Sequence, residues 1–429
     1  MVGGGLSGLF AASELVQRGL DDVVVLEASP LAGGVARTVE RRGFTMEPAV
    51  GSFNLPHPHL TPLLDRAAVK TQQAAEASLR HVFVDGRLVA VPPSPRALLA
   101  PLLGVRSKLR VMVEPLVAAK PVDDESLAGF ARRRFGEGSG ELISWLMATG
   151  VFAGDPHLMS AEAAFPSLVE LERAHGSVLV GALRRRRPSN DERPRTHVPK
   201  GGMSAMVESL ADALGDRFRP GFAVESVRRE GRHWTVDGPE RLTADAVVLA
   251  VPPVAAAGLV EGELGDVLRQ AVAAPVVVMF LGGAAPSPLP DGFGALVGPG
   301  EGLSTRGILF ESSYAPVRAT AGSWLAKVIV GGATDASVVD RADDRLIPGV
   351  VAEVESILGE ELVPDFVEVV RHRPGIPQYG VGHRRWLTAI ADLLATAPGL
   401  HLTGWAYRGV GIANLATDAV RVANAITRS

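Results

Sequence analysis

The sequence contains no cysteine, and this absence excludes several classes of chemistry at once. Without a thiol the chain can form no disulfide, thiolate nucleophile, cysteine-ligated zinc site, iron–sulfur cluster or thioether link to a flavin. Long hydrophobic runs are missing as well, because no window of about 18 uninterrupted apolar residues occurs. The N-terminus opens on glycines in place of the charged and apolar segments of a secretory leader. We therefore expect a cytoplasmic protein whose chemistry comes from a dissociable cofactor or from oxygen, nitrogen and carboxylate groups.

An excess of positive charge is also absent. The 43 lysines and arginines oppose 47 aspartates and glutamates, so the net charge is -4 and no basic field would attract a nucleic acid. Aromatic residues make up only 5% of the chain, yet 47% hydrophobic and 21% charged residues are typical of a globular protein. At roughly 150 residues per domain, the 429 residues indicate two or three folded domains without a nucleic-acid partner.

The N-terminus carries the pattern of a dinucleotide-binding turn. Gly3, Gly5 and Gly8 form G-x-G-x-x-G, a helical pattern follows, and the apolar run Val23–Leu26 ends at Glu27. Glycines allow the backbone to turn tightly and to approach a pyrophosphate, which the N-terminus of the following helix stabilises through its N–H groups and dipole. Glu27 stands nineteen residues after Gly8, near the spacing of about 20 expected for a carboxylate that binds a ribose diol.

The first strand of this unit is unusually short. Only Met1 and Val2 precede the first glycine, whereas a β-strand usually has about five residues. Losing the missing buried residues would remove on the order of several kcal/mol of hydrophobic stabilisation. We therefore expect the start of the protein to lie upstream of Met1.

A second pair of glycines follows Glu27. Gly33 and Gly34 come shortly before the basic residue Arg37. Nicotinamide dehydrogenases do not generally continue in this way. The continuation resembles the two-dinucleotide-binding flavoproteins, in which the second glycine turn packs against the phosphates of the flavin, and this resemblance implies FAD.

The rest of the chain predicts an α/β (α+β) fold with discontinuous domains. Helical periodicity extends from Ser94 to about Leu183, and the apolar run Asp245–Val251 is typical of a buried parallel strand. We expect an FAD-binding domain of the two-dinucleotide-binding type, with an interrupted Rossmann-like sheet, over 1–75, 200–260 and 376–429. A mixed-sheet substrate domain would comprise 76–93 and 261–375, and an inserted helical domain would comprise 94–199.

Several further segments resemble one family closely: Gly150–Asp155, Phe165–Leu168, Lys200–Met203, Pro374–His383 and Pro398–Ile412. Through them the chain is similar to the FAD-dependent protoporphyrinogen and coproporphyrinogen oxidases of haem synthesis, of the bacterial type and within the flavin amine oxidase superfamily. The resemblance runs from Val2 to about Thr427. The segments I-P-Q-Y-x-V-G-H and A-Y-R-G-V-G carry most of its specificity.

The resemblance implies a set of FAD contacts distributed along the chain. Val224 would meet the adenine through its backbone, although without the resemblance it would be interpreted as an ordinary strand valine. The implied cofactor-binding residues are Gly3, Gly5, Leu6, Ser7, Gly8, Glu27, Ala28, Gly34, Ala49, Val50, Gly51, Ser52, Val224, Val410, Gly411 and Ile412.

For the substrate, the resemblance implies that Arg80 pairs with a porphyrinogen propionate. A guanidinium suits this role because it makes two charge-assisted hydrogen bonds to one carboxylate. Without the resemblance, Arg80 would be one solvated arginine among many. The other implied substrate-binding residues are Gly150, Ala153 and Gly154 as a closely approaching wall, and Ile308, Leu309 and Phe310 as an apolar face that could equally be plain core.

The implied reaction needs no catalytic side chain and no metal. A meso C–H of the porphyrinogen transfers hydride to flavin N5, pyrrole N–H protons leave to solvent, and O2 reoxidises the flavin to give H2O2. The tetrapyrrole and O2 would be the small-molecule partners, with the chain a monomer or homodimer. In some members of the family the helical domain touches the membrane, so a peripheral contact at the inner face of the cell membrane stays open.

Three departures from the family pattern keep alternatives open. Trp405 stands where the family has asparagine, and Asn414–Thr417 and Ala49–Phe53 differ from the usual flavin-contacting segments. The chain could therefore be a flavin oxidase of an amine or a polyene, or a flavin- or porphyrin-binding paralogue without turnover. His57 and His59 could suggest a metal site, but they lack a nearby carboxylate or thiolate cluster and are better explained by a proline-rich surface loop.

Overall fold

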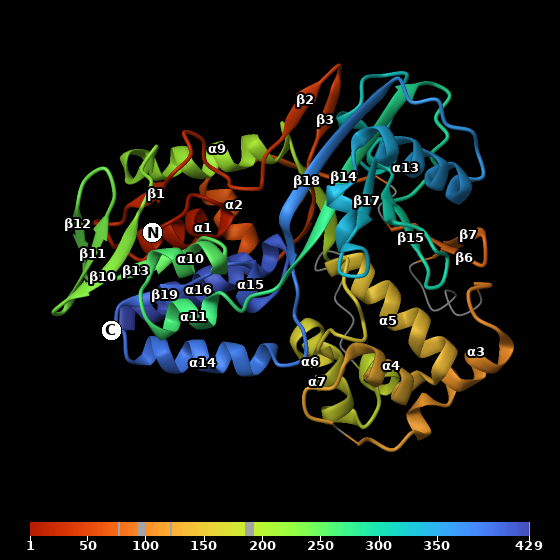
Figure 1. Ribbon diagram of the computed structural model, residues 1–429, viewed down its shortest axis with the longest axis horizontal. Coiled ribbons are helices and arrows are strands. Elements are labelled where there is room, and N and C mark those ends of the chain that lie inside the picture. Colours follow the sequence, from red (N-terminus) through yellow and green to blue (C-terminus); the bar gives the residue numbers. More distant parts are fainter. Residues whose placement is uncertain (76–77, 93–99, 121, 185–192, 429) are drawn as a thin grey trace.

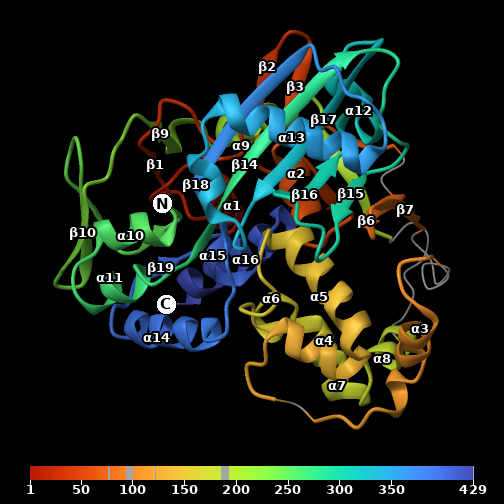
Figure 2. The ribbon, with the colours of Figure 1, turned by 45° about the vertical axis from the view of Figure 1, so that its right-hand side comes forward.

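The computed structural model describes residues 1–75, 78–92, 100–120, 122–184 and 193–428. Figure 1 shows one body around α1 (Leu6–Gln17) and α16 (Ile412–Arg428), which holds both labelled termini, a second body built on a large sheet, and a third body of helices. Two long strands, β14 (Ala273–Ala284) and β18 (Phe366–Pro377), run side by side from the first body into the large sheet (Figures 1 and 2).

The first body contains a parallel sheet whose central strand is reduced to one residue. β9 (Phe218–Pro220) pairs with β1 (Val25–Glu27), and β13 (Val247–Leu249) pairs with β19 (Leu400–Leu402). Val2 joins the two pairs through parallel bridges to β1 and β13. Because these strands come from distant parts of the sequence, the sheet is interrupted as predicted, and the predicted α/β fold class is confirmed.

Helices cover both faces of this parallel sheet, because each buries an apolar side. On one face, Leu9 and Phe10 of α1 and Ala416 of α16 are buried with residues of α2 (Leu60–Arg66) and α9 (Gly202–Leu214). The opposite face packs against α10 (Pro253–Leu259), α11 (Glu263–Leu268), α14 (His383–Ala395) and the meander of β10 (Ser226–Glu230), β11 (His233–Asp237) and β12 (Leu242–Ala244).

The second body is a seven-stranded mixed sheet. Neighbouring strands are antiparallel except for one parallel pair, β15 with β6. Its order is β18, β14, β17 (Ser323–Gly331), β16 (Thr305–Leu309), β15 (Gly294–Val297), β6 (Arg80–Val84) and β7 (Arg87–Val91).

The two faces of the large sheet meet different partners. One face is covered by α13 (Asp343–Leu358), whose Leu346 and Val350 are buried against it. The other face contacts the hairpin of β2 (Val39–Arg41) and β3 (Phe44–Met46) through Phe280 and its neighbours. Lys327 lies on this second face beside Phe280, and its Nζ donates to the carbonyls of Glu47 and Ala49, so this face is turned toward the segment that leads into the first body.

The third body consists of helices, and buried charges help to hold it together. Arg134 and Glu114 are both fully buried and form an ion pair, and Ser126 caps its helix by accepting the Gly129 N–H at 3.1 Å. Its α-helices are α3 (Val105–Met112), α4 (Leu127–Phe135), α5 (Glu137–Phe152), α6 (Ala161–Ala164), α7 (Pro166–His175) and α8 (Val178–Arg184).

The residues at the end of the expected helical domain, 94–199, form a strand. Arg195–Pro199 forms strand β8, which pairs with β4 (Phe53–Leu55) and β5 (Thr71–Gln73) in a separate small sheet. Among the described residues, no helix combines the length and the apolar character needed to cross a membrane.

Candidate functional site

The G-x-G-x-x-G segment forms a tight turn between α1 and Val2, the residue that bridges two strands of the parallel sheet. Gly3 has φ +106°, and a Cβ on Gly8 would stand 1.9 Å from the Gly3 carbonyl oxygen, so both positions require glycine. Gly5 differs, because the nearest atom to a Cβ there would be the Gly33 carbonyl oxygen at 3.8 Å. The N–H of Gly33 donates to the Gly4 carbonyl at 2.8 Å, so the two glycine turns predicted from sequence lie against each other.

Glu27 ends β1 at the rim of this turn. Its carboxylate accepts the N–H of Gly4 at 2.7 Å and the N–H of Ser29 at 2.8 Å, and its carbonyl accepts the N–H of Phe222 at 2.8 Å. These bonds orient the side chain and leave lone pairs for a diol. They also bring the segment that contains half-buried Val224 next to Glu27 and Ala28, as a shared nucleotide site requires.

A crevice of about 280 Å³ opens from the two glycine turns. The helices α1 and α16 begin near it, and the backbone N–H groups at a helix N-terminus can bind an anion. The crevice is lined by Gly5, Leu6, Ser7, Gly33, Gly34, Val35, Ala36, Ala250, Val251, Pro252, Pro253, Val254, Ala271, Val272, Ala273, Pro374, Gly375, Pro377, Gly404, Trp405, Ala406, Tyr407 and Leu415.

Two buried polar atoms that belong to crevice residues have no protein partner. They are the indole Nε1 of Trp405 and the hydroxyl of Tyr407. Burial, with a smaller contribution from Asp418, raises the pKa of the Tyr407 hydroxyl, so this group stays a hydrogen-bond donor. Since buried polar groups are nearly always paired, the two donors indicate a ligand in the crevice.

The turn that leads into α16 is held by Tyr379. Its hydroxyl accepts the N–H of Gly409 at 2.6 Å and donates to the carbonyl of Trp405. The predicted cofactor residues Val410, Gly411 and Ile412 follow this turn, and Gly411 has φ +108°. Ile412 is buried as the first residue of α16, and Val410 packs against the core of the helical body.

The predicted cofactor segment from Ala49 to Ser52 does not line the crevice. It lies against the large sheet, where Lys327 Nζ donates to the carbonyls of Glu47 at 2.6 Å and Ala49 at 2.5 Å, and Arg318 donates to the carbonyl of Gly51. Burial lowers the pKa of Lys327 to about 7, with the nearby Arg318 adding to this effect. Half-buried Val50 packs on the core of the first body, and Ser52 is also half-buried.

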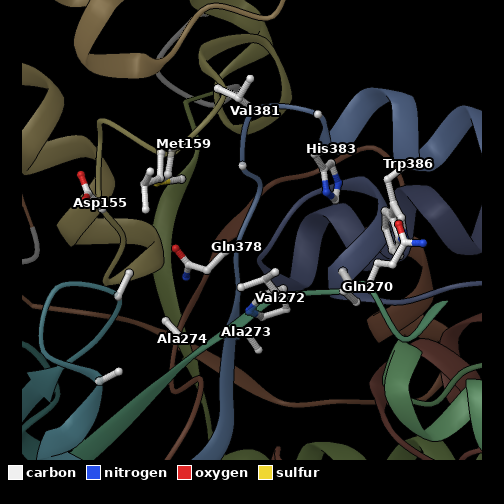
Figure 3. Close-up of a pocket in the computed structure, with 18 of the residues that line it drawn as sticks. Asp155, Met159, Gln270, Val272, Ala273, Ala274, Gln378, Val381, His383 and Trp386 are labelled. Atoms are coloured by element: carbon white, nitrogen blue, oxygen red, sulfur yellow. The ribbon is translucent and has the colours of Figure 1, made fainter. Parts of the chain in front are cut away.

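A larger and mostly apolar cavity of about 550 Å³ adjoins the crevice (Figure 3). The two share Ala271–Ala273, Pro377 and Ala406 as walls. The remaining lining residues are Asp155, Leu158, Met159, Gln270, Ala274, Pro275, Ala333, Ala336, Gln378, Gly380, Val381, Gly382, His383 and Trp386.

His383 supplies the polar group on the aromatic side of this cavity. Its ring stacks on Tyr379 with centroids 4.2 Å apart and 12° between planes, and it contacts Trp386 at 5.2 Å. Its Nε2 is buried without a partner. Burial lowers the pKa of His383 to about 4, partly offset by Asp124, so the imidazole is neutral near pH 7.

Ala153 and Gly154 lie beside this cavity. A Cβ on Gly154 would stand 2.6 Å from the Met159 sulfur and 2.8 Å from Gln378 Oε1, so glycine is needed for the close approach. Ala153 ends α5 in the left-handed conformation and accepts the N–H of cavity-lining Ala333 at 2.8 Å. Gly150 is exposed and faces Leu296 instead.

The other predicted substrate residues lie elsewhere on the large sheet. Strand register places Arg80 and Leu309 in one row, on the face turned toward the first body, and the Arg80 guanidinium lies 4.9 Å from the Phe293 ring centroid. Ile308 and Phe310 are buried on the opposite face under α13. The expectation of one apolar face is therefore wrong, because successive strand residues point to opposite sides. Neither Arg80 nor Leu309 lines the crevice or the larger cavity.

His57 has a local structural role. Its Nδ1 accepts the N–H of Leu60 at 3.2 Å at the start of α2, and its own N–H donates to Thr61 Oγ1 at 2.9 Å. Burial lowers the pKa of His57, with a smaller contribution from His59. Among the described residues no group of three or more histidine, aspartate or glutamate side chains is arranged to hold a metal.

The sequence profile of the family described as flavin containing amine oxidoreductase matches residues 6–427. The chain belongs to this family. It is 26% identical over 454 residues to the coproporphyrinogen III oxidase of Bacillus subtilis (strain 168), with 96% of this chain and 94% of the relative covered. It is 28% identical to the chloroplastic protoporphyrinogen oxidase of Oryza sativa subsp. japonica, with 100% and 87% covered.

Solved structures show the same fold. This flavin containing amine oxidoreductase is similar to a protein from Exiguobacterium sp. 255-15 provisionally assigned as a protoporphyrinogen oxidase, with TM-score 0.83, 24% identity, and 99% of this chain and 97% of that chain covered. It is also similar to a putrescine oxidase bound to putrescine, with TM-score 0.72, 18% identity, and 100% and 98% covered. Family membership confirms the predicted resemblance, the oxidoreductase class and the FAD cofactor.

The crevice residues fit this cofactor. Gly5 leaves space where a pyrophosphate would approach, Glu27 is oriented for a ribose, and the unpaired donors of Trp405 and Tyr407 need acceptor atoms such as a flavin dinucleotide carries. The sequence prediction missed these two donors and His383, although all three lie in the segments that carried the resemblance. No sequence signal could show that their polar atoms lack partners, because this depends on every neighbouring segment.

Proposed function

We propose that this flavoprotein oxidises a porphyrinogen, either protoporphyrinogen IX or coproporphyrinogen III, to the porphyrin in haem or porphyrin biosynthesis, with O2 as acceptor and H2O2 as product. The observation that carries the proposal is the 550 Å³ apolar cavity that shares a wall with the flavin crevice. A flat and largely apolar macrocycle suits such a cavity. The names of the relatives, which match over nearly their whole lengths, support the same reaction.

The residues of this chain bind and orient the cofactor and the substrate. The glycine turns and Glu27 would hold the dinucleotide part of FAD, and the bound flavin supplies a two-electron acceptor. The shared wall of Ala271–Ala273 and Pro377 offers no polar side chain, so it excludes water between the two sites. His383 is neutral and places one unpaired ring nitrogen at the cavity, where it can exchange a hydrogen bond with a pyrrole.

Arg80 is the proposed partner of a substrate carboxylate. Arg80 is exposed at the start of β6, and the Phe293 ring 4.9 Å away supports the plane of its guanidinium. A planar guanidinium can make two charge-assisted hydrogen bonds to one carboxylate. Arg80 lines neither the crevice nor the larger cavity, so this role and the placement of the macrocycle in the 550 Å³ cavity are alternatives, which the Arg80→Ala variant separates.

A peripheral membrane contact is proposed for the helical body. Val105, Leu109, Met112 and Leu116 are 56–85% exposed along and just after α3, and exposed Arg106 lies in the same helix. Apolar side chains with neighbouring cations suit an anionic bilayer surface. In a flotation assay with anionic vesicles, the wild-type protein should float with the vesicles. A Leu109→Glu/Leu116→Glu double variant should remain in the bottom fraction. Equal flotation of both proteins would contradict this contact.

The function is tested by reducing the flavin anaerobically. Each porphyrinogen, an aliphatic diamine and a polyene are added separately to purified protein, and the visible flavin absorbance is followed. Bleaching by a porphyrinogen alone, with recovery and H2O2 release when O2 is admitted, is the expected result. Bleaching by the amine or polyene would identify a different substrate class, and no bleaching by any of them would favour a binding protein without turnover.

A further inference from the structure

Trp405 begins the short helix α15 (Trp405–Arg408) at the wall of the flavin crevice. Its indole Nε1 is buried and has no hydrogen-bond partner. An indole N–H can only donate, so the missing partner must be an acceptor. Other tryptophans of the same body are satisfied: the indole N–H of Trp234 donates to the Pro398 carbonyl at 3.0 Å, and that of Trp386 donates to the Val267 carbonyl at 2.8 Å.

The position of α15 indicates which part of the cofactor is near. The preceding residue, Gly404, has φ +142°, and a Cβ on it would stand 3.9 Å from Ser7 Oγ. Ser7 belongs to the first turn of α1, the helix N-terminus at which a pyrophosphate is stabilised. The chain around Trp405 therefore passes beside the anion-binding end of the crevice.

Tyr407 provides a second, independent unpaired donor on the same short helix. Its buried hydroxyl has no partner, and its ring is fixed by parallel stacking on Trp386 at 5.7 Å. The two side chains leave α15 in different directions, because Trp405 packs on the core around α1 and Tyr407 belongs to the core on the opposite face of the parallel sheet. Each buried donor therefore needs an acceptor of its own, and only the Trp405 donor lies on the α1 side.

We propose that the Trp405 indole N–H donates to an anionic oxygen of the FAD pyrophosphate. The Trp405 ring also lines the crevice, and it packs partly buried on the core around α1.

The test compares FAD affinity in Trp405→Phe and in wild type. Phenylalanine keeps an aromatic ring and removes only the N–H. Holoprotein is diluted stepwise, and released FAD is measured by its fluorescence. Loss of one hydrogen bond to a charged group should raise the Kd for FAD about 10- to 100-fold. ADP, which contains the pyrophosphate but no flavin, should lose potency as a competitor by a similar factor.

Trp234→Phe is the matched control, because its indole N–H already has a protein acceptor. It should leave the Kd for FAD unchanged. If Trp405→Phe does not yield folded protein, Trp405→Asn is compared with Trp405→Leu, and tighter FAD binding by the asparagine variant is expected. An unchanged Kd in Trp405→Phe, an equal rise in Trp234→Phe, equal affinities of the asparagine and leucine variants, or weaker FAD binding with unchanged ADP potency would each overturn the proposal.

Discussion

His383 should make the stability of this protein depend on pH between about 4 and 6.5. Burial holds its pKa at about 4 in the folded chain, against an ordinary value of 6.5. Within that window the unfolded chain binds more protons than the folded chain, so stability rises with pH and is lost as pH falls. From these two pKa values, His383 alone should cost about 2 kcal/mol of unfolding free energy between pH 7.5 and pH 5.

The perturbation is His383→Phe, which keeps an aromatic ring between Tyr379 and Trp386 and removes the titrating group. Urea unfolding at pH 7.5 and pH 5 is measured for wild type, for His383→Phe and for His157→Phe, which replaces an exposed histidine. Comparing the change between the two pH values removes any constant effect of the substitution. The His383 variant should lose about 2 kcal/mol less than the other two proteins on acidification. Equal losses in all three would refute the reasoning that burial in the aromatic stack keeps His383 neutral.

Three further predictions concern single residues. Gly8→Ala should abolish flavin loading, because its Cβ would meet the Gly3 carbonyl oxygen at 1.9 Å; flavin absorbance per mole of protein measures this, and normal loading would contradict the tight turn. Arg134→Met should lower the unfolding free energy by about 3–5 kcal/mol, because Glu114 would remain buried without its ion-pair partner. Urea unfolding measures this, and an unchanged midpoint would show that the pair contributes little. Arg80→Ala should raise KM for the porphyrinogen about 10- to 100-fold at unchanged flavin content, with partial recovery in Arg80→Lys. An unchanged KM would identify Arg80 as an ordinary surface arginine.

Local spacing was sufficient to predict the glycine turn, the helix that follows it and the strand that ends at Glu27. The glycines of the first turn, Glu27 at the end of the following strand and the second glycine pair act within one continuous segment, and their geometry depends on backbone conformation that only glycine permits. The family, the fold class and the flavin cofactor could therefore be predicted from residues that are close in sequence, together with the I-P-Q-Y segment.

The tertiary structure decided everything that depends on which distant segments meet. Ile308 and Phe310 point away from Leu309 because of strand alternation, and β8 leaves the helical region because its partners are β4 and β5. The sequence favours an exposed loop over an anionic-lipid contact for the arginine run that begins at Arg184, and this run continues outside the described residues. The unpaired donor of Trp405 could be found only in three dimensions. The type of a side chain determines which hydrogen bonds it can make. Only the surrounding fold determines which of these bonds find a partner within the protein.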